Sequence, residues 1–412
     1  MFDGLHSNVQ VRTHDSIYDD RTLSFDEAVK DLFTPDLLEN GLIASDMDDT
    51  MFVGDLGIKA FVRKLDSPGF WNRSPAEFKK LVLPKSYRTI LNLGAQGFVV
   101  EKVDQGLSLD AGICQLFLDL VEDVSDLYES VYKTATSNEM NIKNPLVGEF
   151  ALKLYLIDQL TLQNDPIFRY GTGGQILMRT RYLLGRRGID IEEITSDMMR
   201  VGQNDEDRMI NLSLGSQNRG LVGMDRLSDY LDDEGVLGID QYVGPVEGVR
   251  NIIMGLFNDA SGLPVHVVTT NLYQIAQIAL KNSKYAPLLT QTNFNEGVIT
   301  ASSLEHSDVH GTFGSKMVYP AVFGHVKRER LIGIQDSMRI KVILALGDSF
   351  SNDTPMMDLA LDNGGVCVVV GDDYKTTRKK FDPFVQRAKE RLNDGEIRKR
   401  VLYVEKDGQE AS

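Results

Sequence analysis

An apolar segment that ends in closely spaced aspartates dominates the first part of the sequence. Residues Gly41–Ser45 have the composition of a short buried strand, and Asp46-Met47-Asp48-Asp49-Thr50 follows directly. In open α/β sheets, ligands bind beyond the carboxyl ends of the strands. Two carboxylates this close repel each other unless positive charge lies between them, which a divalent cation together with a phosphate group can supply. The spacing also allows one aspartate to act as a nucleophile while the other moves a proton.

A second acidic turn follows another buried-strand pattern far downstream. Residues Val342–Leu346 are continuously apolar, and Gly347-Asp348-Ser349-Phe350-Ser351-Asn352-Asp353 comes next. Such a run predicts a fully buried strand, and Gly347 permits close approach of the backbone. Mg²⁺ takes oxygen ligands and is usually held by one or two carboxylates together with substrate phosphate. The two acidic turns therefore predict a Mg²⁺ site.

A hydroxyl-bearing turn lies between these two segments. The apolar, β-branched run Pro264–Val268 ends in Thr269-Thr270-Asn271. A hydroxyl at a strand end can donate a hydrogen bond to a phosphate oxygen. We favour Thr269 over Thr270 as that donor and expect Asn271 to hold the loop.

A lysine opens the helix that is predicted before the second acidic turn. Gly324-His325-Val326-Lys327 leads into a helical stretch over 328–335. A lysine there can act as a point charge on phosphate. Lys316 is a rival for this role, and we prefer Lys327 because its helix feeds the strand that ends at Asp348.

The chain resembles the haloacid dehalogenase-like (HAD) superfamily, whose four motifs occur in the same order. The residues that carry the resemblance are Asp46-x-Asp48-x-Thr50, Thr269, Lys327 and Gly347-Asp348…Asp353. The last two motifs look most like the phosphoserine-phosphatase-like branch, which includes phosphorylcholine phosphatases; so do Pro245–Val249 and Gly297–Ala301. The resemblance covers 42–50 and about 244–371. Asn352 and Asp353 are displaced by one residue from the usual spacing of that branch, which leaves their roles open.

The resemblance implies an α/β fold: a HAD-type, Rossmann-like parallel sheet core with a large, mainly helical cap domain inserted between the first and second motifs. Residues 1–55 and 242–412 would form the catalytic core, and 56–241 the cap. Short apolar runs that alternate with helices also predict a parallel sheet for the core directly. Amphipathic segments such as Phe150–Leu162 predict helices within 56–241, where strand patterns are few.

The resemblance also implies a Mg²⁺-dependent phosphatase that hydrolyses a small phosphomonoester through an aspartyl phosphate. Asp46 would be the nucleophile, and Asp48 the general acid and base. Three side chains are implied as phosphate ligands: Thr50, Thr269 and Lys327. Four residues are implied at the metal: Asp46, Asp48 through its backbone carbonyl, Asp348, and Asp353 as either a supporting residue or a direct ligand.

Two other functions are compatible with the same residues. The aspartyl phosphate could pass to a second substrate, which would make the protein a phosphotransferase or mutase. The motifs could also persist in a non-catalytic protein-binding protein. A large cap implies a small phosphorylated metabolite as the partner. Phosphoserine, phosphorylcholine, nucleotides and sugar phosphates are all compatible with the motifs.

Composition bounds the remaining possibilities. The net charge of −16 argues against nucleic acid as a partner, since phosphate-backbone binding needs a basic surface. The first 20 residues lack the basic and apolar regions of a secretory signal, and no stretch is apolar enough to predict a membrane span. Cys114 and Cys367 predict reduced structural thiols, so we expect a cytoplasmic protein.

Four further patterns have ordinary explanations. Tyr170-Gly171-Thr172-Gly173-Gly174 lacks the lysine of a phosphate-binding P-loop and predicts a helix boundary. Residues 305–311, which contain His306 and His310, predict a loop rather than a zinc site. Trp71 is expected in the core of the cap rather than in a pocket for a cationic head group. Asp49 is expected to be a solvated neighbour of the site.

Overall fold

The computed structural model describes residues 9–13, 22–66, 70–71, 73–82, 85–96, 100–102, 105–107, 111–134, 141–163, 188–202, 208–213, 231, 235–258, 262–291, 297–307, 312–318, 322–372 and 374–406. The chain divides into two compact units. The first comprises Met1–Leu56, Val243–Ser303 and Val318–Ser412, and the second Gly57–Tyr242 and Leu304–Met317. The sequence-based division had assigned 304–317 to the core, whereas their contacts group them with the second unit.

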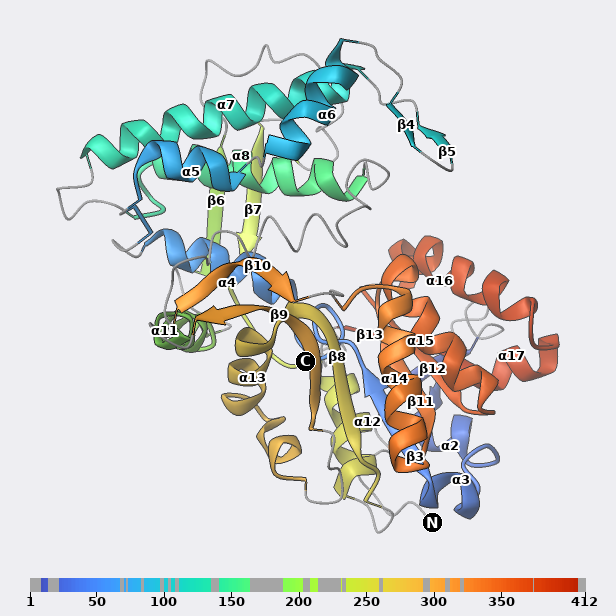
Figure 1. Ribbon diagram of the computed structural model, residues 1–412. Coiled ribbons are helices and arrows are strands. Elements are labelled where there is room, and N and C mark those ends of the chain that lie inside the picture. Colours follow the sequence, from blue (N-terminus) through green and yellow to red (C-terminus); the bar gives the residue numbers. More distant parts are fainter. Residues whose placement is uncertain are drawn as a thin grey trace. The chain divides into compact units, whose positions relative to one another are not determined.

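The largest sheet among the described residues is mainly parallel, and most of its strands belong to the first unit (Figure 1). The strand order is β10-β9-β8-β3-β11-β12-β13-β1-β2. Neighbouring strands from β9 to β13 in this order are parallel, and β1 is antiparallel to both β13 and β2. The strands are β1 (Gln10–Thr13), β2 (Leu23–Ser24), β3 (Gly41–Ser45), β8 (Val265–Leu272), β9 (Ile299–Ser307), β10 (Thr312–Val318), β11 (Lys341–Gly347), β12 (Val366–Gly371) and β13 (Val401–Glu405). The predicted α/β architecture with a parallel sheet is confirmed.

Helices cover both faces of this sheet, which explains why its central strands are apolar at consecutive positions. Every residue of β3 and β12 is buried. Adjacent residues of β13 show the two layers: Tyr403 belongs to a core cluster with α14, α15, α16 and α17, whereas Val404 lies against Gly248 of α12. The helices are α2 (Phe25–Val29), α3 (Pro35–Glu39), α12 (Glu247–Asn258), α13 (Tyr273–Lys281), α14 (His325–Met338), α15 (Phe350–Asp362), α16 (Tyr374–Lys389) and α17 (Asp394–Arg400), with the 3₁₀-helix η5 (Ala286–Thr290).

Three segments differ from the sequence-based prediction. The strand expected to end at Val268 continues as β8 to Leu272, with an irregular register that takes in Thr269 and Asn271. The expected loop over 305–311 is wrong for its first part, because β9 extends to Ser307. The polar lead-in contains strand β1, which pairs with β13 and so extends the sheet at its antiparallel edge. Pairing with a neighbouring strand can outweigh weak local propensity, which is why these segments were missed.

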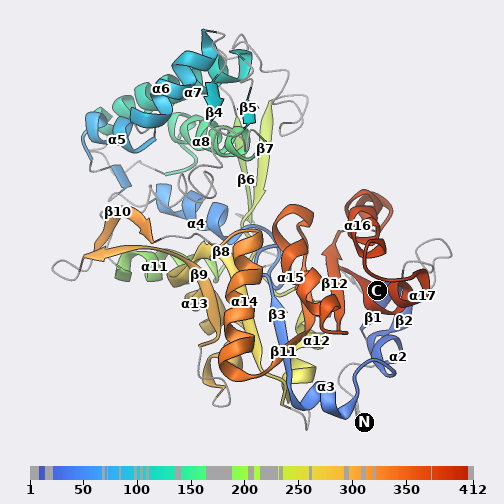
Figure 2. The same cartoon turned by 45° about the vertical axis from the view of Figure 1, so that its right-hand side comes forward.

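The second unit is mainly helical (Figure 2). Its described helices are α4 (Leu56–Leu65), α5 (Pro75–Val82), α6 (Lys85–Ala95), α7 (Ala111–Thr134), α8 (Pro145–Gln163) and α11 (Gly188–Met198). Two small antiparallel sheets accompany them: β4 (Val100–Lys102) with β5 (Gln105–Leu107), and β6 (Met209–Ser213) with β7 (Val236–Asp240). Trp71 is 2% exposed among aromatic side chains that include Phe70, Tyr128 and Phe150, so its predicted place in the core of this region is confirmed.

Several smaller predictions can also be compared with the structure. Cys114 and Cys367 are both free and buried, and burial together with nearby Asp358 raises the pKa of Cys367 to about 12. The expected helix start at Ser24 is present, with a reciprocal capping box between Ser24 and Glu27. None of the helices that the structure describes is both long and apolar enough to cross a bilayer. The glycine-rich segment 170–174 and His310 lie outside the described residues.

A buried histidine in β8 should make the stability of the first unit depend on pH. His266 donates through Nδ1 to the Gly297 carbonyl (2.9 Å), and its Nε2 accepts from the Thr300 hydroxyl (2.7 Å). Burial lowers its pKa from 6.5 to about 4, against the opposing hydrogen bond to Gly297. Between these values the unfolded chain binds a proton that the native state excludes, so stability falls as pH falls. We expect His266 to account for about 3 kcal/mol of that loss.

Denaturant unfolding of the wild type and His266→Gln between pH 7 and pH 4 measures this contribution. The advantage of the wild type over the variant should be largest at pH 7 and should shrink on acidification. His325→Gln, at an exposed position, is the matched control and should follow the wild type. A constant difference between wild type and His266→Gln at all pH values would contradict the prediction.

Candidate active site

The two acidic turns lie side by side because β3 and β11 are parallel neighbours. Asp46 follows β3 and Asp348 follows β11, and the Asp46 amide donates to the Leu346 carbonyl at 2.9 Å. From β3 the chain first builds outward through β8 and β9, then returns to the other side of β3 to form β11, β12 and β13. The site therefore lies at the point where the strand order reverses, the usual ligand position in an open α/β sheet.

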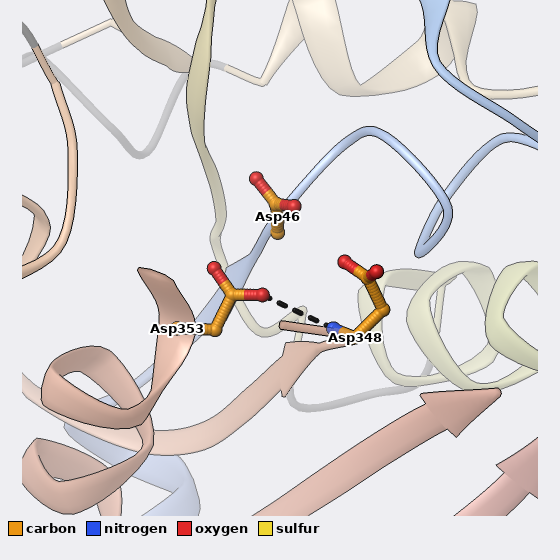
Figure 3. A group of neighbouring side chains, drawn as sticks. All are labelled: Asp46, Asp348 and Asp353. Carbon is orange, nitrogen blue, oxygen red and sulfur yellow. Dashed lines mark hydrogen bonds between the residues drawn. The ribbon is translucent and has the colours of Figure 1, made fainter. Parts of the chain in front are cut away.

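Three carboxylates gather at this edge (Figure 3). Asp46, Asp348 and Asp353 each offer an oxygen atom, and these atoms lie within 4.8 Å of one another. Asp46 and Asp353 are buried, and Asp348 is half-buried. The fully buried Lys327 at the start of α14 donates through Nζ to Asp46 Oδ1 (2.6 Å) and to Asp353 Oδ1 (2.7 Å).

The cluster carries more negative charge than Lys327 alone neutralises. Burial and the nearby Asp353 raise the pKa of Asp46 to about 7, although Lys327 opposes the rise. Burial and the charges of Asp353 and Asp46 raise the pKa of Asp348 well above its usual value. Burial alone would lower the pKa of Lys327, but its two carboxylate partners raise it, so this lysine stays charged. An all-oxygen donor set with unmet negative charge fits a hard divalent cation such as Mg²⁺.

Asp353 and Asn352, whose roles the sequence left open, have different partners. Asp353 lies in the first turn of α15, where Oδ2 accepts the amide hydrogens of Asp348 (3.1 Å) and Ser349 (3.0 Å). Its other oxygen holds Lys327. Consecutive helix residues point about 100° apart, and Asn352 accordingly turns to another partner, accepting the Gly324 amide at 2.9 Å. Asp353 thus braces Lys327 and the turn, while Asn352 ties α15 to the start of α14.

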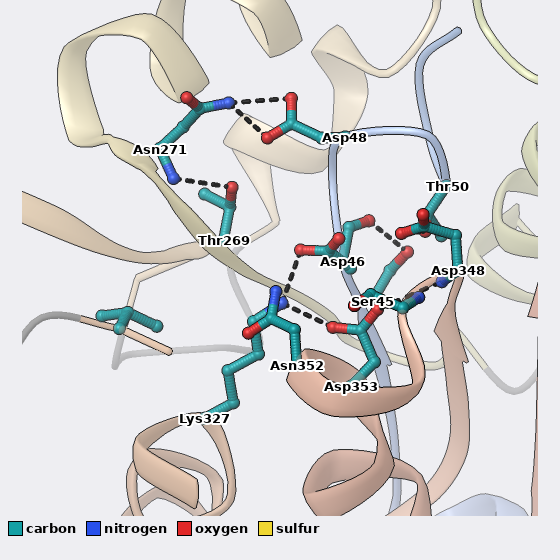
Figure 4. Close-up of polar contacts among 12 residues, drawn as sticks. Ser45, Asp46, Asp48, Thr50, Thr269, Asn271, Lys327, Asp348, Asn352 and Asp353 are labelled. Carbon is teal, nitrogen blue, oxygen red and sulfur yellow. Dashed lines mark hydrogen bonds and ion pairs between the residues drawn. The ribbon is translucent and has the colours of Figure 1, made fainter. Parts of the chain in front are cut away.

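Asn271 holds the Asp48 carboxylate (Figure 4). The sequence predicted only that Asn271 would hold its own loop. The Asn271 side-chain amide donates to both carboxylate oxygens of Asp48, at 2.8 and 2.6 Å, and the Leu56 amide donates to Oδ1 at 3.0 Å. The Asn271 backbone amide in turn donates to Thr269 Oγ1 at 3.1 Å. Asp48 therefore has a defined position beside the carboxylate cluster, on the same turn as Asp46.

Two of the predicted phosphate ligands, Thr50 and Thr269, have different hydrogen-bond partners. Thr50 is buried and donates to Asp348 Oδ1 at 3.4 Å, so its hydroxyl orients a carboxylate. Thr269 is buried in the irregular part of β8, where its oxygen accepts from Asn271 and its hydroxyl hydrogen is left to donate elsewhere. The rival Lys316 lies in β10, and its side chain is outside the described ones.

Asp49 is more than the solvated neighbour that the sequence predicted. It has a positive φ of 53°, and its Oδ1 accepts from the Gly54 amide (3.1 Å) and from Lys406 Nζ (2.6 Å). Lys406 follows the last strand and is 9% exposed. Nothing in the sequence pattern linked this lysine to the turn.

Mg²⁺ should stabilise the protein through this cluster. A ligand that binds only the native state raises stability by about 2.7 kcal/mol at 100 times its dissociation constant. We expect the melting temperature to rise by several degrees with Mg²⁺ in the wild type and not in Asp348→Asn. Asp362→Asn, which alters an exposed carboxylate of α15, should retain the rise. An equal rise in all three proteins, measured by scanning calorimetry, would show that the cation binds elsewhere.

Comparison with known proteins supports the fold and gives no information on the chemistry of the site. No protein-family model matches the sequence, and no curated protein sequence matches it significantly. The chain is similar to the crystal structure of a conserved protein of unknown function from Anaerococcus prevotii, with TM-score 0.53, 13% identity, and coverage of 95% of this chain and 92% of that one. This likeness extends over nearly the whole length of both chains and concerns the fold alone.

Two further solved structures are more distant. One is a HAD family hydrolase from Salmonella enterica serovar Typhi, with TM-score 0.31, 11% identity, and coverage of 80% of this chain and 62% of that one. The other is a protein of unknown function from Bordetella pertussis, with TM-score 0.31, 11% identity and coverage of 80% and 90%. Likeness at this level carries no argument about the present chain.

Proposed function

We propose that this chain is a HAD-type phosphatase that hydrolyses a small phosphomonoester with the help of Mg²⁺. The observation that carries the proposal is the fully buried Lys327, which bridges Asp46 and Asp353 at the edge of the sheet where Asp348 also lies. Burying a lysine among carboxylates is costly and weak evidence for stability as such. A buried lysine at this position would instead serve to stabilise the charge of a transferring phosphoryl group.

Asp46 is the proposed nucleophile, and Asp48 the proposed general acid and base. Asp46 attacks phosphorus and displaces the leaving oxygen, which takes a proton from Asp48. Asp48 then removes a proton from the water that hydrolyses the aspartyl phosphate. Asn271 fixes the Asp48 carboxylate for both transfers, and its contact with both oxygens explains how a side chain on a turn keeps one position.

The phosphoryl oxygens would be neutralised by three groups. Lys327 supplies a permanent positive charge, and Thr269 a hydrogen-bond donor. Mg²⁺, when bound, would neutralise further phosphoryl charge. The ion would be held by Asp46, the Asp48 carbonyl and Asp348. Asp353 would brace the site, because its oxygens already accept from Lys327 and two backbone amides. We further propose that the second unit acts as the cap that selects the substrate.

Phosphate release from a panel of small phosphomonoesters tests the proposal. The panel includes phosphoserine, phosphorylcholine, nucleoside monophosphates and sugar phosphates, each with Mg²⁺. At least one should release free phosphate, and Asp46→Asn should lower that rate by more than about 10³-fold, because the nucleophile is lost. Asp197→Asn, at an exposed position of α11, is the matched control and should keep the wild-type rate.

The products distinguish hydrolysis from the other functions. Stoichiometric free phosphate supports hydrolysis, whereas a phosphorylated second product without free phosphate would make the protein a phosphotransferase or mutase. Full activity in Asp46→Asn would overturn the mechanism. Silence of the wild type across the panel would overturn the phosphatase proposal and favour a non-catalytic role.

A further inference from the structure

The lysine that follows β13 is fastened to the turn that carries the proposed catalytic aspartates. Lys406 Nζ lies 2.6 Å from Asp49 Oδ1 and 3.4 Å from Asp372 Oδ1. The Asp372 side chain is 66% exposed, so solvent screens that contact strongly. The Lys406 side chain is 8% and that of Asp49 36% exposed. Burial alone would lower the pKa of Lys406, but nearby carboxylates raise it, Asp49 most and then Asp372 and Asp348. Asp49 is therefore the main partner.

The backbone at Asp49 is in a conformation that contacts of its side chain help to hold. Its φ of 53° lies in the left-handed region, where a residue with a side chain is strained by roughly 1–2 kcal/mol. The turn is closed by two contacts with Gly54: its amide donates to Asp49 Oδ1 (3.1 Å), and the Asp49 amide donates to its carbonyl (3.4 Å). The same carboxylate oxygen accepts from Gly54 and from Lys406, so the lysine holds the side chain that closes the turn.

This contact spans an unusual distance across the sheet. β13 is separated from β3 by β11 and β12, which places the two strands about 14 Å apart at the usual spacing. Three consecutive side chains of the turn reach three different parts of the sheet. Asp48 is held by Asn271 of β8, Thr50 donates to Asp348 after β11, and Asp49 is held from beyond β13.

We propose that Lys406 is a positioning residue for the proposed general acid, acting through Asp49 on the neighbouring Asp48. The proposal rests on the proposed phosphatase function. Without the lysine, the strained turn loses an anchor directly next to Asp48. Asp46 keeps its place, because its amide is bonded to Leu346 and its carboxylate to Lys327. The defect should therefore fall on proton transfer to the leaving group rather than on attack at phosphorus.

Comparison of two substrates in Lys406→Met tests this division. An alkyl phosphomonoester from the panel needs a proton on its leaving oxygen, whereas p-nitrophenyl phosphate releases an anion that needs none. The value of kcat/KM reports the first half of the reaction for both. We expect it to fall at least about tenfold for the alkyl ester and less than about threefold for p-nitrophenyl phosphate. Lys406→Arg should restore much of the alkyl-ester rate.

Glu405→Gln is the matched control. It removes the ion pair between Arg12 Nε and Glu405 Oε1 (3.2 Å), one residue earlier at the end of β13, and should leave both substrates at wild-type rates. Equal losses on the two substrates, or the same losses in Glu405→Gln, would reduce Lys406 to a structural role and overturn the proposal.

Amide hydrogen exchange of the segment 47–55 tests the anchor without any substrate. It should speed up in Lys406→Met and stay unchanged in Glu405→Gln, while exchange in β11 stays slow in both. If the wild type hydrolyses none of the panel, the proposed function fails and the exchange result alone decides on the anchor. Unchanged exchange of 47–55 in Lys406→Met would refute it.

Discussion

Lys327→Met is expected to destabilise the first unit by about 3–5 kcal/mol and to abolish phosphate release. The methionine leaves Asp46 and Asp353 buried without the ammonium group that now lies 2.6 and 2.7 Å from them. Removing one partner of a buried ion pair leaves the other charge buried and uncompensated. This lowers stability far more than the loss of an exposed ion pair does. Amide exchange of β3 and β11 measures the loss in stability directly, because these strands open with the unit that contains the site.

Lys153→Met separates this effect from the general cost of losing a buried lysine. Lys153 is also nearly fully buried and also bridges two carboxylates, Asp123 (3.0 Å) and Glu149 (2.8 Å), but it lies in α8 of the second unit. Its partners are more exposed, so we expect a smaller loss, visible in the fluorescence of the single tryptophan, Trp71. Phosphate release per folded molecule should survive in Lys153→Met. Retained activity in Lys327→Met would contradict the role given to Lys327.

The strands that carry the site could be read from the sequence because parallel strands covered on both faces must be continuously apolar. Gly41–Ser45 and Val342–Leu346 stand out for this reason; Asp46 follows the first directly, and Asp348 follows the second after Gly347. The parallel direction then brings both acidic turns to one edge without further information. The helix start at Lys327 was readable too, since a glycine precedes it and the Asp348 strand follows.

Contacts between side chains from distant strands could not be read in the same way. Asn271 is 223 positions from Asp48, and Lys406 is 357 positions from Asp49. No local period records such a pairing, because it depends on the order of the strands and on the shape of one turn. The same limit applies to β1, whose short segment becomes a strand only because β13 offers an edge. The acids of the site could thus be found from the sequence, whereas the residues that hold Asp48 and Asp49 could not.

Gly347→Ala is expected to disable the site through a single added methyl group. A Cβ at this position would lie 2.6–2.7 Å from the Cβ, Cγ and Oδ2 atoms of Asp353. Because the Asp353 Cβ is among them, rotation of the far end of the side chain cannot relieve the clash. Asp353 must move away from Lys327 and from the amides of Asp348 and Ser349. Overpacking of this kind typically costs about 1–3 kcal/mol, and we expect phosphate release to fall at least about 100-fold as Lys327 loses its brace.

Gly333→Ala provides the matched control for that result. Gly333 lies within α14, where an added Cβ meets nothing within 4 Å. Alanine there should stabilise the helix by about 0.5–1 kcal/mol, since glycine is the poorer helix former, and should leave the rate unchanged. Thermal unfolding should show a loss of stability in Gly347→Ala and a gain in Gly333→Ala. Phosphate release should fall only in Gly347→Ala. A Gly347→Ala protein as stable and as active as Gly333→Ala would mean that Asp353 does not lie against this glycine, and the bracing of Lys327 would have to come from elsewhere.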